Sequence, residues 1–188
     1  WLRDACRKNG IHTEMIYTGQ TGKLQGGRYG FLLDSTLNDF VSGELESAII
    51  SCDQEEQPDL ILLEGQSSLR NPSGPCGSEY LCSAQAKGVI LQYAPKQKFY
   101  LADDDRELWP MPPIEEELEL IRLYGSETLA LTLNSFNLTK TELKTEQKNL
   151  ETGLGLPVVC PMEEGMERLV PVVQEFIALQ RANTESAK

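Results

Sequence analysis

The sequence predicts an α/β fold built on a mostly parallel sheet with helices on both faces. Strand-like segments alternate with helical segments along the chain, and the interior strand-like segments are apolar throughout. Such alternation is typical of right-handed crossovers between parallel strands, and a strand buried on both faces reads as an uninterrupted apolar run. Glycine-rich turns follow two of the strands, and ligands of parallel sheets bind beyond the carboxyl ends of the strands.

The first half of the chain begins with a charged helical segment that stops at Gly10, a typical C-terminal cap. The expected ranges are a helix at 1–9, a strand at 11–17, a glycine-rich turn at 18–30, a helix at 37–52 and a doubly buried strand at 59–64. Helical spacing predicts that the second of these helices has one apolar face. That face comprises Leu37, Phe40, Val41, Leu45, Ala48 and Ile49.

The second half alternates in the same way after a loop at 65–77. An acidic, proline-bearing excursion at 95–113 predicts a surface loop or lid. Thr139 precedes Glu142 by three residues, a capping-box arrangement at the start of a helix. The other expected elements are helices at 78–87, 114–124, 139–151 and 163–180 and strands at 89–93, 128–133 and 157–160. We expect a single domain over 1–181 and, because its composition is polar, a disordered tail over 182–188.

The formal net charge of −12 predicts poor binding to phosphate backbones and anionic lipids. We therefore expect a small-molecule substrate, with neither nucleic acid nor a membrane as a partner, and a homo-oligomer. The five cysteines are scattered, which favours reduced thiols and a cytoplasmic location. His12 is the single histidine, and one histidine among unclustered cysteines does not predict a metal site.

Three segments follow strands at positions where a ligand would bind. Residues 18–22 (TGQTG) follow the first strand, and their glycines let backbone N–H groups approach an anionic or amide ligand. Glu64 ends the strand at 59–64, a position that suits a Mg²⁺ ligand, and Gly65 beside it leaves room for one. Asn134 ends the third such strand. A structural interpretation stays open for the same three segments: residues 18–22 form a tight turn, and Glu64 and Asn134 are solvated ends of strands.

Other combinations of residues give weaker evidence for a functional site. Asp39 and Glu46 lie seven residues apart on one side of a predicted helix and could face the same site, although an ordinary solvated helix face explains them equally well. The sequence contains no complete Walker A pattern, and one histidine gives no persuasive Ser-His-Asp set.

The motifs TGQTG, DFVSG with Glu46 behind it, and EGQ occur in an order that resembles the DgcN-like family. The resemblance runs from Trp1 to about Val173. It implies a P-loop-NTPase-like domain, similar in architecture to dethiobiotin synthetase, preceded by a smaller Rossmann-like domain. It further implies that the phosphate loop lies upstream of Trp1, so that this chain alone would bind the cofactor poorly. The family includes D-glutamate N-acetyltransferases that use acetyl-CoA.

The resemblance therefore implies transfer of an acetyl group from acetyl-CoA to the amino group of a small acidic amino acid. Such a reaction needs a base for the amine and donors for the oxyanion. Glu64 or Asp39 is the candidate base, and Gln20 is a candidate oxyanion donor. Arg70 and Glu46 are candidates for substrate binding, with Arg70 holding the substrate carboxylate. The candidate cofactor-binding residues are Thr18, Gly19, Thr21, Gly22, Gly65, Gln66 and Asn134.

The chain departs from the family pattern at Ser67, at Asn71-Pro72 and at Tyr93-Ala94, where the family carries a glycine and two histidine-containing pairs. The loss of both histidines removes candidate general bases. Two other functions therefore stay open. One is an ATP- and Mg²⁺-dependent ligase of the dethiobiotin-synthetase type, in which Glu64 holds the metal, and the other is a catalytically degenerate binding module.

Overall fold

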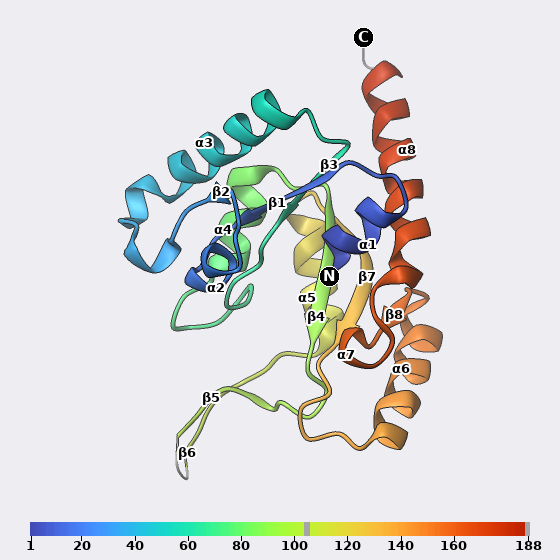
Figure 1. Ribbon diagram of the computed structural model, residues 1–188. Helices are drawn as coiled ribbons and strands as arrows, with labels where there is room; N and C mark the ends of the chain where they lie inside the picture. The colour runs from blue at the N-terminus through green and yellow to red at the C-terminus, as the bar shows by residue number, and fades with distance from the viewer. Residues whose placement is uncertain (104–105, 187–188) are drawn as a thin grey trace. The chain divides into compact units, whose positions relative to one another are not determined.

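The computed structural model describes residues 1–103 and 106–186. The chain divides into two compact units: the N-terminal unit, Arg3–Ala86, and the C-terminal unit, which comprises Lys87–Lys188 with Trp1–Leu2. Strands and helices alternate in both units, and the predicted α/β class with mostly parallel strands is confirmed (Figure 1). The prediction of a single domain stays a prediction.

The N-terminal unit holds a three-stranded parallel sheet of order β2-β1-β3. Its elements are α1 (Leu2–Lys8), β1 (Thr13–Tyr17), α2 (Gln20–Leu24), β2 (Tyr29–Gly30), η1 (Leu33–Ser35), α3 (Asn38–Glu56), β3 (Leu60–Leu63) and α4 (Cys76–Ala84). Ile16 of β1 pairs with Leu63 of β3, so both strands end at the same edge of the sheet. The core lies between the sheet and the helices and includes Ile16, Val41, Leu45 and Cys52.

The C-terminal unit holds a second parallel sheet, of order β4-β7-β8, and a separate antiparallel hairpin. Its elements are β4 (Gly88–Tyr93), β5 (Phe99–Asp103), β6 (Arg106–Pro110), α5 (Ile114–Leu123), β7 (Glu127–Leu133), α6 (Lys140–Leu154), β8 (Val158–Val159), α7 (Pro161–Glu164), η2 (Glu167–Leu169) and α8 (Val170–Ser186). Leu131, Leu143 and Val158 lie in its core. The predicted capping box is confirmed, because Thr139 and Glu142 exchange hydrogen bonds at the start of α6.

Several local expectations are wrong. The stretch 18–30 contains α2 and β2 rather than only a turn, and 95–113 contains the β5–β6 hairpin, which extends away from the rest of its unit, rather than a loop. Helix α2 and strand β2 are short, and the β5–β6 hairpin is interrupted by acidic residues. Neither of the two stretches therefore produces a long periodic pattern. Residues 104–105 of the excursion lie outside the described residues.

The ends of three elements also differ from expectation. Leu37 and Phe40 are 73% and 61% exposed, because they fall at the N-cap and in the first turn of α3, before the stretch that packs in the core. The four residues of β3 are half-buried rather than fully buried. Helix α8 continues to Ser186, where a tail was expected. Residues 187–188 of that tail lie outside the described residues.

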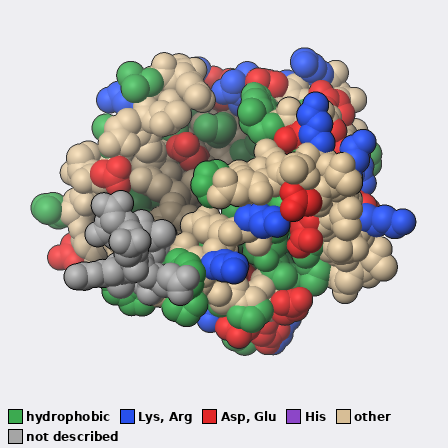
Figure 2. Space-filling model, turned by 90° about the horizontal axis from the view of Figure 1, so that it is seen from below, with side chains coloured by type: hydrophobic (Ala, Val, Ile, Leu, Met, Phe, Trp, Pro, Cys, Tyr) green, Lys and Arg blue, Asp and Glu red, His purple; other side chains and the backbone are tan. Residues whose placement is uncertain are grey.

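Acidic and basic side chains are interspersed across the face shown in Figure 2. Among the helices of the described ranges, none is long and apolar enough to cross a membrane.

Candidate functional site

The loops that follow β1 and β3 meet at one edge of the N-terminal sheet, and Glu64 joins them. One carboxylate oxygen of Glu64, Oε2, accepts hydrogen bonds from the backbone N–H of Thr18 at 2.8 Å and of Gly19 at 3.2 Å. The Thr18 hydroxyl in turn donates to the backbone oxygen of Glu64 at 3.2 Å. Two N–H donors fix the carboxylate and complement its negative charge. The two motifs predicted from sequence to flank a ligand are thus in direct contact.

Gly22 is the glycine that this contact requires. A Cβ atom at Gly22 would lie 2.5 Å from Cβ of Tyr17 and 2.9 Å from Oε2 of Glu64. Gly30 of β2 pairs with Tyr17 of β1 and has a φ of +141°, and a Cβ atom there would lie 2.1 Å from the Tyr17 carbonyl oxygen. The glycines around Tyr17 therefore let the chain fold closely around the end of β1 and bring α2 against Glu64.

Gln66 extends the polar cluster toward η1. Its Oε1 lies 3.3 Å from the Thr18 hydroxyl, and its Nε2 donates to Oδ1 of Asp34 at 3.1 Å. Thr18 is fully buried, whereas Asp34 is exposed. Sequence reasoning missed Asp34, because its place in a short 3₁₀ turn carries no periodic or motif signal.

Tyr80 of α4 lies close to Thr18. Sequence reasoning also missed this residue, because an aromatic residue on a helix is typical of an ordinary core. It is 4% exposed, and its hydroxyl has no hydrogen-bond partner among the described residues. Burial raises the pKa of Tyr80 to about 12, against a smaller opposing effect of the Thr18 side chain. The phenol therefore stays protonated at neutral pH. The hydroxyl of Ser68, in the loop after β3, is likewise buried without a partner.

The other predicted site residues of the N-terminal unit are exposed. Gln20 and Thr21 lie in the first turn of α2 rather than in a loop, Asp39 and Glu46 lie on α3, and Arg70 lies in the loop after β3 with Gly65 at its start. Their proposed roles stay predictions.

Asn134 belongs to the C-terminal unit and follows β7. Its side-chain oxygen accepts a hydrogen bond from the N–H of Phe136 at 3.0 Å, and its own N–H donates to the carbonyl oxygen of Tyr93 at 2.8 Å. The first contact closes an Asx turn, which is a structural use of the side chain. Cofactor binding by Asn134 stays a prediction.

Chemically, this edge presents a carboxylate held in one orientation, a side-chain amide and a buried phenol. A fixed carboxylate can accept a proton from a substrate or ligate a divalent cation. The N–H groups of Thr18 and Gly19 donate to Glu64, so these two amides orient the carboxylate. Cofactor binding by residues 18–22 stays a prediction.

Comparison with known proteins identifies relatives of nearly the whole chain. Residues 1–170 match the family described as "Domain of unknown function (DUF1611_C) P-loop domain". A protein named D-glutamate N-acetyltransferase from Tritonibacter scottomollicae is 29% identical over 169 residues, which cover 86% of this chain and 48% of that protein. A crystal structure of a DUF1611 family protein from Anabaena variabilis ATCC 29413 matches with a TM-score of 0.80 and 23% identity, over 93% of this chain and 51% of that one. The chain spans about half the length of both relatives.

Proposed function

The chain belongs to the DUF1611 family as its P-loop domain, and on that basis we propose that it forms part of an N-acetyltransferase. The enzyme would move the acetyl group of acetyl-CoA to the amino group of D-glutamate or a similar small acidic amino acid. The observation that carries this proposal is the 29% identity, across most of the chain, to a protein named D-glutamate N-acetyltransferase. We also propose that the complete enzyme contains a further domain, that it is cytoplasmic and that it forms a homo-oligomer.

In this reaction the amine nitrogen attacks the thioester carbonyl carbon, an amide bond forms and the carbon–sulfur bond breaks. The amine nitrogen loses a proton to a base, and the departing thiolate of CoA takes up a proton. We assign the base to Glu64, because its carboxylate is half-buried and oriented by two backbone N–H groups. Oε2 accepts both of these bonds, so Oε1 is the oxygen we assign to the proton transfer.

The other roles follow from position and residue type. Gln20, exposed at the start of α2, is our candidate donor to the oxyanion, since it directly follows the amides that hold Glu64. Arg70, exposed in the loop that Glu64 opens, suits the side-chain carboxylate of the substrate, because a guanidinium binds carboxylates through two parallel hydrogen bonds. Asp39 remains the second candidate for the base.

The test is an acetylation assay with acetyl-CoA and D-glutamate, run on the protein that contains this chain and followed by release of the CoA thiol. We expect turnover without ATP or Mg²⁺. Glu64→Gln preserves the size of the side chain and removes the base, and we expect it to lower turnover by about 100-fold or more. Asp39→Asn is the matched variant at the alternative position. Full turnover in Glu64→Gln with loss in Asp39→Asn would move the role of base to Asp39.

A second candidate function rests on the position of Glu64 at the end of β3. A carboxylate at the tip of a strand suits Mg²⁺ bound to a nucleotide, as in an ATP-dependent ligase of the dethiobiotin-synthetase type. Calorimetric titration separates the two: binding of acetyl-CoA alone supports acetyl transfer, and binding of Mg-ATP alone supports the ligase. Binding of neither favours a degenerate module and would count against both enzymes.

A further inference from the structure

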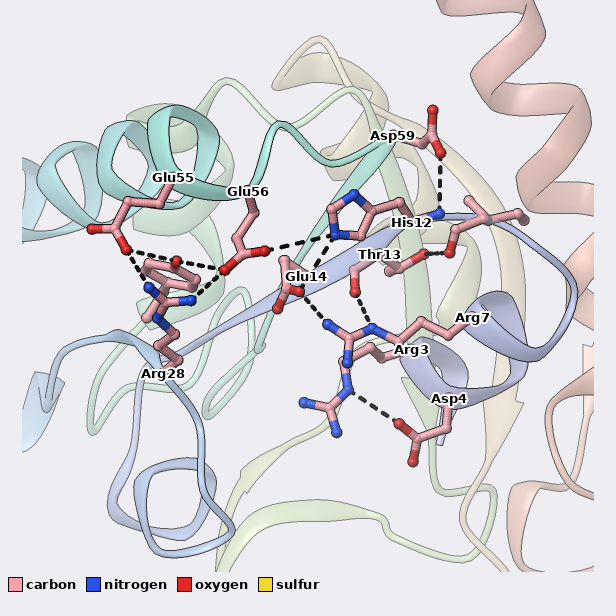
Figure 3. Close-up of polar contacts among 12 residues, drawn as sticks. Arg3, Asp4, Arg7, His12, Thr13, Glu14, Arg28, Glu55, Glu56 and Asp59 are labelled. Atoms are coloured by element: carbon pink, nitrogen blue, oxygen red, sulfur yellow. Dashed lines mark hydrogen bonds and ion pairs between the residues drawn. The ribbon is translucent and has the colours of Figure 1, made fainter.

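A cluster of one imidazole and two carboxylates lies on the N-terminal unit, and it comes from three different parts of the chain. His12 directly precedes β1, Glu14 lies within β1 and Glu56 is the last residue of α3. Nε2 of His12 lies 3.8 Å from Oε1 of Glu14 and 3.9 Å from Oε2 of Glu56. All three potential ligand atoms lie within 4.8 Å of one another (Figure 3).

The backbone holds His12 in place. Its N–H donates to Oδ2 of Asp59 at 3.1 Å, and its carbonyl oxygen accepts the N–H groups of Asp59 and Leu60 at 2.8 and 3.2 Å. Because His12 and Glu14 are two residues apart on extended chain, their side chains lie on the same face. The side chain of His12 is 45% exposed, which leaves a path for an ion from solvent.

Neighbouring side chains orient both carboxylates. Arg7 binds Oε1 of Glu14, the same oxygen that faces His12, and donates through Nε to the carbonyl oxygen of Thr13 at 2.7 Å. Arg28 binds Glu55 and Glu56 through different nitrogens, and on Glu56 it binds Oε1, whereas Oε2 faces His12. One oxygen of the Glu56 carboxylate thus contacts Arg28 and the other faces the imidazole of His12, as Figure 3 shows.

Tyr29 supports the same orientation. Its hydroxyl donates to Oε2 of Glu55 at 3.0 Å and lies 3.2 Å from Oε1 of Glu56. Outer partners of this kind fix the direction of metal ligands.

The charge and ligand set suit a divalent cation. Three carboxylates (Glu14, Glu55 and Glu56) face two arginines, which leaves one negative charge when the imidazole is neutral. One imidazole nitrogen and two carboxylate oxygens match the ligands of zinc sites that keep an open position. Bonds of about 2.0–2.1 Å in tetrahedral geometry place ligand atoms about 3.3 Å apart. The two distances from Nε2 of His12, 3.8 and 3.9 Å, would therefore shorten by about half an ångström on binding. The two carboxylate oxygens, which lie within 4.8 Å of each other, would approach by up to about 1.5 Å, a movement that rotation of the half-buried glutamate side chains would supply.

We propose that His12, Glu14 and Glu56 bind a first-row divalent cation of the zinc type, with one atom from each residue and a water molecule in the fourth position. The sequence alone does not predict such a site, because the ligands are spread from position 12 to position 56 and the only histidine lies outside every recognised metal spacing. The proposal is independent of acetyl transfer and of the Glu64 site.

The test is calorimetric titration of the chain with Zn²⁺, in a Cys82→Ser background because Cys82 is an exposed free thiol. We expect one site per chain. His12→Gln and Glu56→Gln should each weaken binding by about tenfold or more, since each removes a ligand. Glu55→Gln is the matched control: it removes a neighbouring carboxylate that binds Arg28 but does not face His12, and we expect a change of less than about threefold.

Two results would overturn the proposal. Equal weakening by Glu55→Gln and Glu56→Gln would mean that the cation responds only to the net charge of the surface. Unchanged binding in His12→Gln would place the ion elsewhere, for example on the remaining thiols. Absorption of bound Co²⁺ distinguishes nitrogen and oxygen ligands from thiolates, and circular dichroism checks that each variant is folded. None of these readouts depends on acetylation, so failure here leaves the proposed function untouched.

Discussion

At the scale of single residues, two glycines of the N-terminal unit have opposite requirements. Gly22 is enclosed by Tyr17 and Glu64, whereas nothing lies within 4 Å of a Cβ atom placed at Gly43 in α3. Gly22→Ala should therefore destabilise the protein by about 1–3 kcal/mol through overpacking, and it should also displace Glu64 from its N–H donors. Gly43→Ala should stabilise it by about 0.5–1 kcal/mol, because alanine loses less backbone entropy in a helix.

Unfolding in urea measures both changes in the free energy of unfolding, provided that its dependence on urea concentration has the same slope in each variant. Wild-type stability in Gly22→Ala would show that the end of β1 rearranges at little cost and would remove the steric reason for the glycine. Gly43 belongs to the DFVSG motif, so its variant carries further information. A stabilised Gly43→Ala protein that has lost acetylation would mean that this glycine serves the reaction rather than the fold.

The residue-scale contacts of the site were predictable only in part. The meeting of residues 18–22 with Glu64 follows from two strands that end at one sheet edge, which apolar runs and glycines reveal in the sequence. The contact of Gln66 with Asp34, and of His12 with Glu56, joins side chains through turns and helix ends whose directions no local pattern encodes. Such contacts become visible only when the chain is folded.

At the scale of elements, the start of α6 depends on one reciprocal pair. The N–H of Glu142 donates to Oγ1 of Thr139 at 3.2 Å, and the N–H of Thr139 donates to Oε2 of Glu142 at 2.8 Å. Thr139→Ala should cost about 1 kcal/mol near neutral pH, since it leaves a helix N–H without its cap. Thr141→Ala, an exposed change two residues further along the same helix, is the matched control and should be neutral or slightly stabilising.

The same pair makes the stability of α6 depend on pH. The backbone N–H of Thr139, then its hydroxyl and Lys96, lower the pKa of Glu142 from 4.5 to about 2. A carboxyl whose pKa is lower in the folded state stabilises the fold above its unfolded pKa, and that contribution is lost as pH falls from 4.5 toward about 2. Glu142→Gln should therefore flatten the fall in urea midpoint over this range. An unchanged acid profile would contradict the effect.

The elements that sequence reasoning identified are those with strong local signals. The apolar runs of β3, β4 and β7 and the capping box of α6 were predicted because each element carries its own pattern. Helix α2 has five residues and β2 has two, too few for a period to emerge. The β5–β6 hairpin pairs residues across an acidic centre, and such pairing depends on register rather than on composition.

At the scale of the whole molecule, the chain consists of two compact units, each with its own parallel sheet. A single domain, as the length predicts, requires the two units to unfold in one cooperative transition. Leu45 in the N-terminal unit and Leu131 in the C-terminal unit are both fully buried, so they provide equivalent perturbations. Replacement of either by alanine should cost about 2–5 kcal/mol.

Hydrogen exchange read by mass spectrometry reports each unit separately during this experiment. Amides with global protection exchange only through complete unfolding. We therefore expect Leu131→Ala to accelerate exchange of the slowest amides in β1 and β3 as much as in β7 and β8. Leu45→Ala should likewise accelerate exchange in β7 and β8 as much as in β1 and β3. Exchange that accelerates in the mutated unit alone would overturn the single-domain prediction. The Glu64 site and the proposed cation site would then belong to a unit whose stability is independent of the C-terminal sheet.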